Sequence, residues 1–508
     1  MVDELNKAYS GKILDIAGLE AVIGSIGKRE KKIVLCHGVF DVVHPGHIRH
    51  LAYAKSRADV LVVSITCDRW VEKGAYRPHV PESLRALSLA ALEMVDFVLI
   101  DKNKTPIENL KILKPDFFAK GFEYSDNLPE ATLEEMDIVS EFGGSVLFTP
   151  GDVVYSSTKL INQFTPSLKM EKLEVLMQQF DLSLDKIRET VNSLAGQRVH
   201  VVGDTIIDTY TRTVLIGGNT KTPTFSVLFD SKEDYVGGAG IVSQHMKAAG
   251  ADVIFTTLLG DDDLGRFAQD HLKNAGIELN VIIDEGRPTT NKNAIIADGY
   301  RLLKIDTLDN ATIVPDIRNQ FQKKVKETQT DCIVFSDFRH GIFNRNTVKM
   351  LISAIPDGAL TVADSQVASR WGNITEFENL DLVTPNEREA RFALADQDSN
   401  IVQLSHTIKD RTGSSNVILK LGPRGLFFLS DNSYQYIDSF ATNVKDAVGS
   451  GDALLAYATL TLRKTGSLAE ACFVGAVAAA CECEFDGNIP ISPDLINIKI
   501  DEIEKAIQ

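Results

Sequence analysis

Short apolar runs alternate with longer amphipathic stretches in the first third of this chain. The apolar runs lie at 33–36, 60–65, 97–100, 117–119 and 146–148. Apolar runs of this length, separated by helical patterns, are typical of parallel strands joined by crossover helices. The pattern predicts a parallel sheet covered by helices, whose first strand leads into a loop at Gly38.

A second alternating series begins at 199–202 and continues through the rest of the chain. Its strand-like runs include 332–335, 417–420 and 426–429. Within it, segments 293–297 and 302–305 flank Asp298-Gly299, a residue pair that favours a tight turn between antiparallel strands. The hairpin predicts a small β lid on an otherwise parallel α/β domain.

The segment between the two series lacks strand-like runs and is rich in charged helix formers. We interpret residues 165–196 as a helical linker. A chain of 508 residues is too long for a single hydrophobic core. The sequence therefore predicts a first α/β domain over 1–164 and a second over 197–508.

Composition narrows the classes of partner. Apolar residues make up 44% and charged residues 24%, as in soluble globular proteins, and the net charge of −17 argues against a nucleic acid or an anionic membrane as the main partner. The six cysteines lack zinc-site spacing, which predicts reduced, buried thiols. Neither a signal peptide nor an apolar run of membrane-spanning length is visible, so we expect a cytoplasmic protein.

Two histidines follow the first predicted strand in the segment His44-Pro45-Gly46-His47. Gly38 permits a tight turn at the carboxyl end of that strand, where open α/β sheets place ligands. His47 falls near the start of the next helix, where free N–H groups favour phosphate. Two imidazoles at this spacing can donate hydrogen bonds to an α-phosphate during in-line displacement. We expect His44 and His47 to be catalytic and His50 to be structural.

A second phosphate motif, Gly449-Ser450-Gly451-Asp452, opens an Ala-rich helix near the other end of the chain. Backbone N–H groups at such a helix start form an anion hole. Asp452 follows directly and can take a proton from an attacking hydroxyl while a γ-phosphate is held nearby. A chain with both motifs is expected to phosphorylate a small molecule and then couple that phosphate to a nucleotide.

The first motif, Gly38-Val39-Phe40-Asp41 with the two histidines, resembles the cytidylyltransferase-like nucleotidyltransferase family over about residues 12–164. The resemblance implies a Rossmann-like fold and a nucleotide site formed by Gly38, Phe40, Asp41, His44, His47, Lys55, Ser157 and Thr158. Arg77 and Lys120 would offer positive charge to substrate phosphate. For Lys55, an ordinary surface lysine is the alternative.

The second motif and its companions resemble the ribokinase-like carbohydrate kinases, the phosphofructokinase B family, over about residues 198–490. The companions are glycine-rich segments at 237–240 and 260–265, the segment 386–389, and the segment 420–425. The resemblance implies that Asp452 is the base and that Gly449, Ser450 and Gly451 form the anion hole. It also implies an ATP site lined by Lys420, Gly422 and Gly425, with Asn386 and Glu389 near Mg²⁺. The sugar would be bound by Asp208, Gly237 and Gly238.

Both halves together resemble the bifunctional kinase–adenylyltransferases of ADP-heptose synthesis, with the domain order reversed. This resemblance implies that the kinase half phosphorylates heptose 7-phosphate at its anomeric hydroxyl, with ATP and Mg²⁺. It implies that Lys292 and Arg301 bind the distal phosphate of the sugar. It also implies a homo-oligomer. The chain departs from the pattern at Ile241, where the kinase family commonly has a sugar-binding asparagine, and at His37, which replaces a small or amide residue.

Two other functions stay open. The nucleotide could be CTP and the substrate a different sugar or polyol phosphate. Alternatively, one half is a non-catalytic ligand-sensing module, an interpretation that Ile241 favours and that the intact Asp452 and histidine pair oppose.

Overall fold

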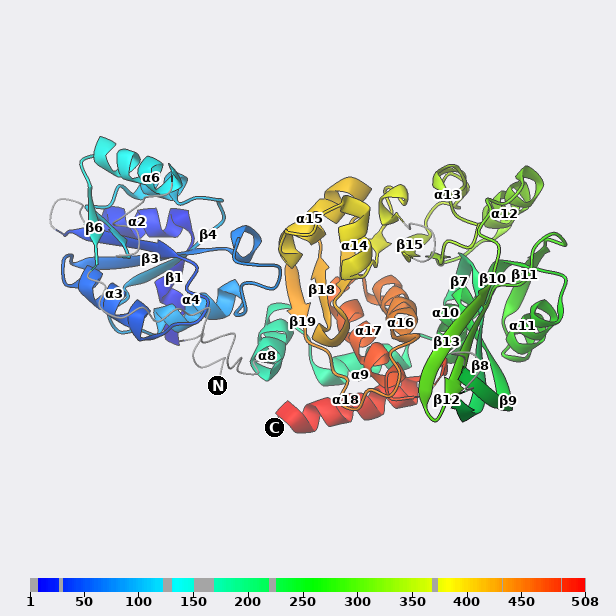
Figure 1. The fold of residues 1–508 in the computed structure, drawn as a ribbon. Coiled ribbons are helices and arrows are strands. Elements are labelled where there is room, and N and C mark those ends of the chain that lie inside the picture. Colours follow the sequence, from blue (N-terminus) through cyan, green and yellow to red (C-terminus); the bar gives the residue numbers. More distant parts are fainter. Residues whose placement is uncertain are drawn as a thin grey trace. The chain divides into compact units, whose positions relative to one another are not determined.

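A computed structural model of the chain describes residues 8–26, 31–121, 130–149, 169–218, 225–367, 373–431, 433–485 and 487–507. Its internal contacts divide the chain into two compact units, described separately below. The first unit comprises residues 1–171 and 398–403, and the second comprises 172–397 and 404–508. Each unit has its own β-sheet with helices packed on it (Figure 1).

The first unit is built on a six-stranded sheet in the order β1-β4-β3-β2-β5-β6. Its strands are β1 (Ile13–Leu14), β2 (Ile33–Gly38), β3 (Val60–Thr66), β4 (Phe97–Asp101), β5 (Phe117–Lys120) and β6 (Ser145–Phe148). Its helices are α2 (Ile16–Ile26), α3 (Pro45–Lys55), α4 (Glu82–Ala90), α5 (Ile107–Leu113) and α6 (Glu130–Glu141). All five strand pairings are parallel, which confirms the predicted parallel sheet.

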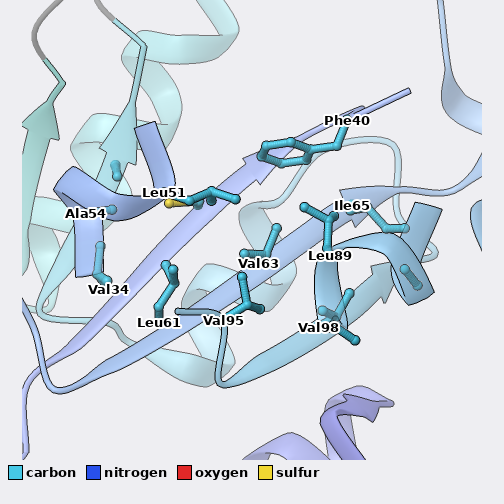
Figure 2. Close-up of a cluster of buried hydrophobic side chains, with 14 residues drawn as sticks. Val34, Phe40, Leu51, Ala54, Leu61, Val63, Ile65, Leu89, Val95 and Val98 are labelled. Atoms are coloured by element: carbon cyan, nitrogen blue, oxygen red, sulfur yellow. The ribbon is translucent and has the colours of Figure 1, made fainter. Parts of the chain in front are cut away.

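Strand β3 is buried along its whole length because apolar side chains pack against both faces of the sheet. Leu61 and Val63 belong to one apolar cluster, and Val60 and Val62 belong to another. Successive strand residues point to opposite faces, so the two clusters lie on the two sides of the sheet. Figure 2 shows the first cluster, in which Leu51 of α3 packs toward the sheet. This packing fixes α3, whose start carries the histidine pair.

The second unit has a nine-stranded sheet in the order β11-β10-β7-β14-β15-β16-β17-β18-β19. Its strands are β7 (Arg198–Gly203), β10 (Asp252–Leu259), β11 (Glu278–Ile283), β14 (Cys332–Asp337), β15 (Leu360–Ser365), β16 (Leu382–Val383), β17 (Asn416–Lys420), β18 (Leu426–Leu429) and β19 (Tyr434–Ile437). The pairings are parallel from β11 to β17, and the last two are antiparallel. An α/β fold was predicted for this part of the chain and is confirmed.

Helices cover this larger sheet. They are α8 (Lys169–Gln179), α9 (Leu184–Asn192), α10 (Ala239–Ala248), α11 (Asp263–Asn274), α12 (Pro315–Glu327), α13 (Arg345–Ile352), α14 (Glu387–Leu394), α15 (Ile401–Thr412), α16 (Ser450–Thr465), α17 (Leu468–Glu482) and α18 (Pro493–Ile507). The first two fall in the segment interpreted as a helical linker. Among the described residues, no helix combines the length and hydropathy of a membrane span.

A separate four-stranded sheet, in the order β13-β12-β8-β9, forms the lid (Figure 1). Its strands are β8 (Thr205–Gly218), β9 (Phe225–Gly238), β12 (Asn291–Ala297) and β13 (Tyr300–Thr307). Asp298 and Gly299 both have positive φ, 49° and 82°, as two-residue hairpin turns require. The predicted hairpin is confirmed because β12 and β13 are antiparallel neighbours joined by this turn.

Candidate functional sites

Helix α16 begins at a glycine that no other residue could replace without strain. Gly449 has φ 88°, and a β-carbon there would lie 2.9 Å from Glu482 Oε1 and 3.1 Å from Asn488 Oδ1. The first backbone N–H groups of a helix lack intrahelical partners and can bind an anion, although the Ser450 N–H here donates to the Ala447 carbonyl at 3.4 Å. Ser450 follows, and the half-buried Cys483 thiol hydrogen-bonds with its side chain.

Asp452 lies in the first turn of α16 and is buried. Its Oδ1 has no hydrogen-bond partner among the described residues. Burial, together with the carboxylates of Asp364 and Asp208, raises the pKa of Asp452 to about 8, against the opposing effect of Lys420. A buried carboxylate with a free oxygen and a raised pKa has the properties of a general base.

The Lys420 ammonium lies beside this turn at the end of β17. A β-carbon at Gly451 would stand 3.5 Å from Lys420 Nζ, and the ammonium donates to both oxygens of Asp364 at 2.8 and 2.9 Å. Asp364, at the end of β15, was not singled out from the sequence. The pair places a positive charge next to the glycine-rich turn and holds it there.

Asn386 and Glu389 form a capping box at the start of α14. The Glu389 N–H donates to Asn386 Oδ1 at 2.8 Å, and Glu389 Oε2 accepts from the Asn386 N–H at 2.6 Å. Asn386 also pairs with Lys420 in an isolated parallel β-bridge, so the box adjoins the Lys420–Asp364 pair. Burial, with the Asp364 carboxylate and against Lys420, raises the pKa of Glu389 to about 7.

A tight turn follows Lys420. Gly422 and Gly425 have φ of 60° and 88°, and the Leu421 N–H donates to the Gly425 carbonyl at 2.8 Å. A β-carbon at Gly425 would lie 2.0 Å from the Ile437 carbonyl oxygen. Residues 422–424 of this turn between β17 and β18 are exposed.

Asp208 on lid strand β8 lies near α16, close enough to raise the pKa of Asp452. A β-carbon at Gly237 would stand 2.2 Å from Asp208 Oδ2, so the glycine leaves room for that carboxylate. Lys292 is the register partner of Asp208 on β12, and its positive charge opposes the rise in the pKa of Asp208 that burial causes. The structure thus brings Asp208, Gly237 and Lys292 together. Gly238, with φ 62°, begins α10.

Arg301 is placed differently from Lys292. Its Nη2 lies 2.9 Å from Asp446 Oδ2, and its guanidinium stacks over the Tyr210 ring at 5.6 Å. The side chain is therefore partnered by a carboxylate as well as an aromatic ring. Ile241 is fully buried in α10, so the position contributes no polar atom to a sugar site.

In the first unit, the two histidines stack at the start of α3. Their ring centroids are 3.8 Å apart, and the ring of Phe40 meets His47 edge-on at 5.0 Å. The Gly46 N–H donates to His44 Nδ1 at 3.1 Å, so in neutral His44 the proton resides on Nε2. Burial and the neighbouring charges of His44, His50 and Lys73 lower the pKa of His47 to about 4. Burial also lowers the pKa of His44, and the His47 ring additionally hydrogen-bonds with the Val42 backbone.

Asp41 organises the segment opposite the histidines. Its Oδ1 accepts from the backbone N–H groups of His79 and Val80 at 2.8 and 2.9 Å, and its Oδ2 pairs with Arg77 Nε at 2.5 Å. Arg77 Nη2 is buried and has no hydrogen-bond partner among the described residues. Asp41 therefore holds the Arg77 guanidinium in place through Nε, and the Nη2 group of Arg77 is available to an anion.

The other predicted cations of this domain are placed less favourably. Lys120 is buried in an ion pair with Glu135 of α6. Lys55 ends α3, about 12 Å from His47 by helical rise, and its ammonium lies 2.5 Å from Asp96. The Lys55 ammonium is thus held at the end of α3 by Asp96, and its role at the nucleotide site stays a prediction.

The remaining residues of this site were treated differently by the sequence. Ser157 and Thr158, which were predicted to bind nucleotide phosphate, lie outside the described residues. Lys73 was missed from the sequence although its charge reaches His47, and its only signal was a basic residue shortly before Arg77-Pro78. His37 contacts Ser64 Oγ at 3.1 Å and Thr66 Oγ1 at 3.3 Å on β3, and burial with the charge of Lys120 lowers its pKa to about 3.

Comparison with known proteins finds a match to each of the two α/β parts of the chain. The model of the pfkB family carbohydrate kinases matches residues 197–494, and the cytidylyltransferase-like model matches residues 35–163. The cytidylyltransferase-like match therefore precedes the kinase match along the chain.

Curated relatives carry the name "Bifunctional protein HldE". The protein from Campylobacter jejuni subsp. doylei is 27% identical over 306 residues, which cover 59% of this chain and 64% of that protein. The protein from Helicobacter hepaticus is 25% identical over 291 residues, with coverage of 56% and 59%. In Geobacter metallireducens a shorter match of 137 residues reaches 40% identity. The matches thus span less than two thirds of these relatives' length.

Solved structures show the kinase fold. Phosphofructokinase-2 from Escherichia coli in complex with potassium has a TM-score of 0.53 at 18% identity, covering 61% of this chain and 99% of that one. The tetrameric inhibited form of the same enzyme has a TM-score of 0.52 at 17% identity and the same coverage. Because the family model spans more than half of its residues, the chain belongs to the pfkB family of carbohydrate kinases.

Proposed function

We propose that this chain is a bifunctional enzyme of sugar-nucleotide synthesis. Its kinase domain transfers the γ-phosphate of ATP to the anomeric hydroxyl of a sugar phosphate, a heptose 7-phosphate. Its first domain lets the resulting 1-phosphate attack the α-phosphate of a nucleoside triphosphate, ATP, and release pyrophosphate. The observation that carries the proposal is that two distinct helix starts in one chain each combine N–H groups with residues suited to one of these two steps.

In the kinase step, Asp452 takes the proton of the acceptor hydroxyl through its free Oδ1 as that oxygen bonds to the γ-phosphorus. The N–H groups of Gly449, Ser450 and Gly451 receive the charge on the transferred phosphoryl group. Lys420 adds a positive charge beside Gly451. Asp208 binds hydroxyls of the acceptor, and Lys292 binds its distal phosphate.

The kinase step also calls for Mg²⁺ bound to the nucleotide. Carboxylate and amide oxygens suit this ion, and Glu389 and Asn386 present them in the capping box next to Lys420. These two residues would hold the ion, which neutralises charge on the phosphates when bound. Both Glu389 oxygens already accept from Asn386, which favours contact through water.

In the nucleotidyl step, the sugar 1-phosphate is itself the nucleophile, so no residue has to remove a proton. His44 and His47 donate from neutral rings to the α-phosphate as charge accumulates, and Arg77 Nη2 binds a substrate phosphate. The leaving group is pyrophosphate. Catalysis then consists of positioning and electrostatic stabilisation.

Mass spectrometry of the products tests the function. The full chain is incubated with ATP or CTP, Mg²⁺ and a panel of sugar phosphates that includes heptose 7-phosphate. We expect a heptose bisphosphate and then an ADP-sugar. A CDP-sugar would assign the nucleotide to CTP, and hydrolysis of neither nucleotide with any sugar phosphate would contradict the proposal.

The pH dependence of the kinase step follows from Asp452. Its pKa is raised to about 8, so the carboxylate is protonated and inactive as a base at lower pH. We expect kcat/KM for the acceptor to rise with pH up to an apparent pKa of about 8. Asp431→Asn, which changes an exposed carboxylate of the same domain paired with Lys409, is the control and should keep the same rise. A profile that is flat from pH 6 to 9 would contradict the assignment.

We further propose that two copies of the chain pair through the lid. Large apolar side chains gather on its strands and are strongly exposed: Val214, Leu215, Ile216, Phe225, Leu228, Phe229, Tyr300, Leu303 and Ile305. An exposed apolar area of this extent is typical of an interaction surface, and a second copy brings an identical, self-complementary area.

A single charge in the lid should break this pairing. Phe229 is 63% exposed, and we expect Phe229→Asp to raise the dimer dissociation constant at least 100-fold, because it buries a carboxylate in an apolar interface. Light scattering after size exclusion measures the change. Ile498→Asp on α18, where Ile498 is 57% exposed, is the matched control and should behave like wild type. A wild-type chain that is monomeric at high concentration would contradict the pairing.

A further inference from the structure

One amide joins the acceptor side and the phosphate side of the kinase site. Asn488 Nδ2 donates to Asp208 Oδ2 at 3.1 Å, and Asn488 Oδ1 would stand 3.1 Å from a β-carbon at Gly449. Asn488 is only 9% exposed, and its Oδ1 has no hydrogen-bond partner among the described residues. A buried carbonyl oxygen without a donor is unfavourable, so the site is built for a group that donates to it.

Surrounding elements fix the orientation of this amide. Glu482 Oε1 at the end of α17 accepts from the Ile489 N–H at 3.3 Å, and Gly487, with φ 85°, packs against the Tyr235 ring of β9. Exchanging the amide oxygen and nitrogen would set Oδ1 against the Asp208 carboxylate, where two acceptors repel each other. Asn488 therefore keeps its N–H₂ group toward Asp208 and its oxygen toward the glycine-rich turn.

The same turn carries a second free acceptor. Gly449 accepts the Asp452 N–H at 2.9 Å, and Asp452 Oδ1 is buried and unpartnered like Asn488 Oδ1. Asn488 Oδ1 lies beside Gly449, and Asp452 belongs to the same turn. Two unpartnered acceptors at one turn suit a ligand that has two hydrogen-bond donors. Neighbouring hydroxyl groups of a sugar meet this requirement, whereas a carboxylate or phosphate does not.

On the basis of the proposed kinase function, we propose that Asn488 is an acceptor-binding residue of this site. Its Oδ1 accepts a hydrogen bond from the hydroxyl next to the one that is phosphorylated, on carbon 2 for an anomeric hydroxyl. Its Nδ2 holds Asp208 in the position from which that carboxylate binds the sugar. Glu482 acts on the loop as a positioning residue.

Calorimetric titration of the full chain with heptose 7-phosphate and with its 2-deoxy analogue tests the assignment. For wild type, we expect the 2-deoxy compound to bind about tenfold more weakly, because one buried hydrogen bond is lost. In Asn488→Ala, heptose 7-phosphate should lose at least tenfold in affinity, and the two compounds should bind equally. Affinity for ATP should stay within twofold in both proteins.

Asn497→Ala is the matched control, since the Asn497 amide on α18 donates to Asn192 of α9 at 3.0 Å and the variant should bind sugar like wild type. Wild type that binds heptose 7-phosphate while Asn488→Ala retains its affinity and its discrimination between the two compounds would overturn the role of Asn488 alone. Wild type that binds no heptose 7-phosphate would overturn the proposed substrate together with it. An unchanged unfolding temperature of Asn488→Ala separates lost binding from lost structure.

Discussion

Asp452→Asn should lower kinase turnover by about 10²–10⁴-fold while nucleotidyl transfer stays within twofold of wild type. Asparagine has nearly the same shape and fits the same buried position, but it cannot take a proton from the acceptor hydroxyl. ADP formation from ATP and heptose 7-phosphate measures the first activity. Pyrophosphate release with sugar 1-phosphate supplied directly measures the second.

Asp431→Asn serves as the control for this substitution because Asp431 is an exposed carboxylate of the same domain, paired with Lys409. It should leave both activities unchanged. If a folded Asp452→Asn protein lost nucleotidyl transfer as well, the two reactions would share one site and the separation proposed here would be wrong.

His47→Ala should have the opposite effect: nucleotidyl transfer should fall about 10²–10³-fold, and ADP formation should not change. The substitution removes a donor to the α-phosphate and the ring that stacks on His44 at 3.8 Å. The same pair of assays reads out the result.

His50→Gln is the matched control one turn along α3. His50 Nδ1 contacts Thr149 Oγ1 at 3.0 Å, and we expect the variant to keep nucleotidyl transfer within threefold. Equal losses in His47→Ala and His50→Gln would indicate that the substitutions perturb α3 as a whole, and the catalytic role of His47 would then be contradicted.

Features set by neighbouring residues could be predicted from the sequence. The parallel strands of the first domain follow from apolar runs, and the lid hairpin follows from Asp298-Gly299, whose two positive φ angles suit a tight turn. Helix starts at Gly449 and His44 are local in the same sense, because a cap is specified by the few residues around it.

Contacts between distant segments could not be predicted in this way. Asp364 reaches Lys420 only because β15 and β17 end at the same edge of the sheet, and Asn488 reaches Asp208 across 280 residues. Lys55 lies in the same helix as His47 but at the far end, and its ion pair with Asp96 could not be predicted from the local sequence either. Arg301 likewise meets Asp446, a partner that no local pattern indicates.

The thiol next to Ser450 gives experimental access to the phosphate loop. All six cysteines are unpaired and lie among the described residues, five of them are buried, and Cys483 alone is partly accessible. A maleimide fluorophore should therefore attach preferentially at that position without any engineering, at a pH high enough to offset the burial that raises the pKa of the Cys483 thiol. Its emission would then report nucleotide arrival at the kinase domain in real time, independently of turnover.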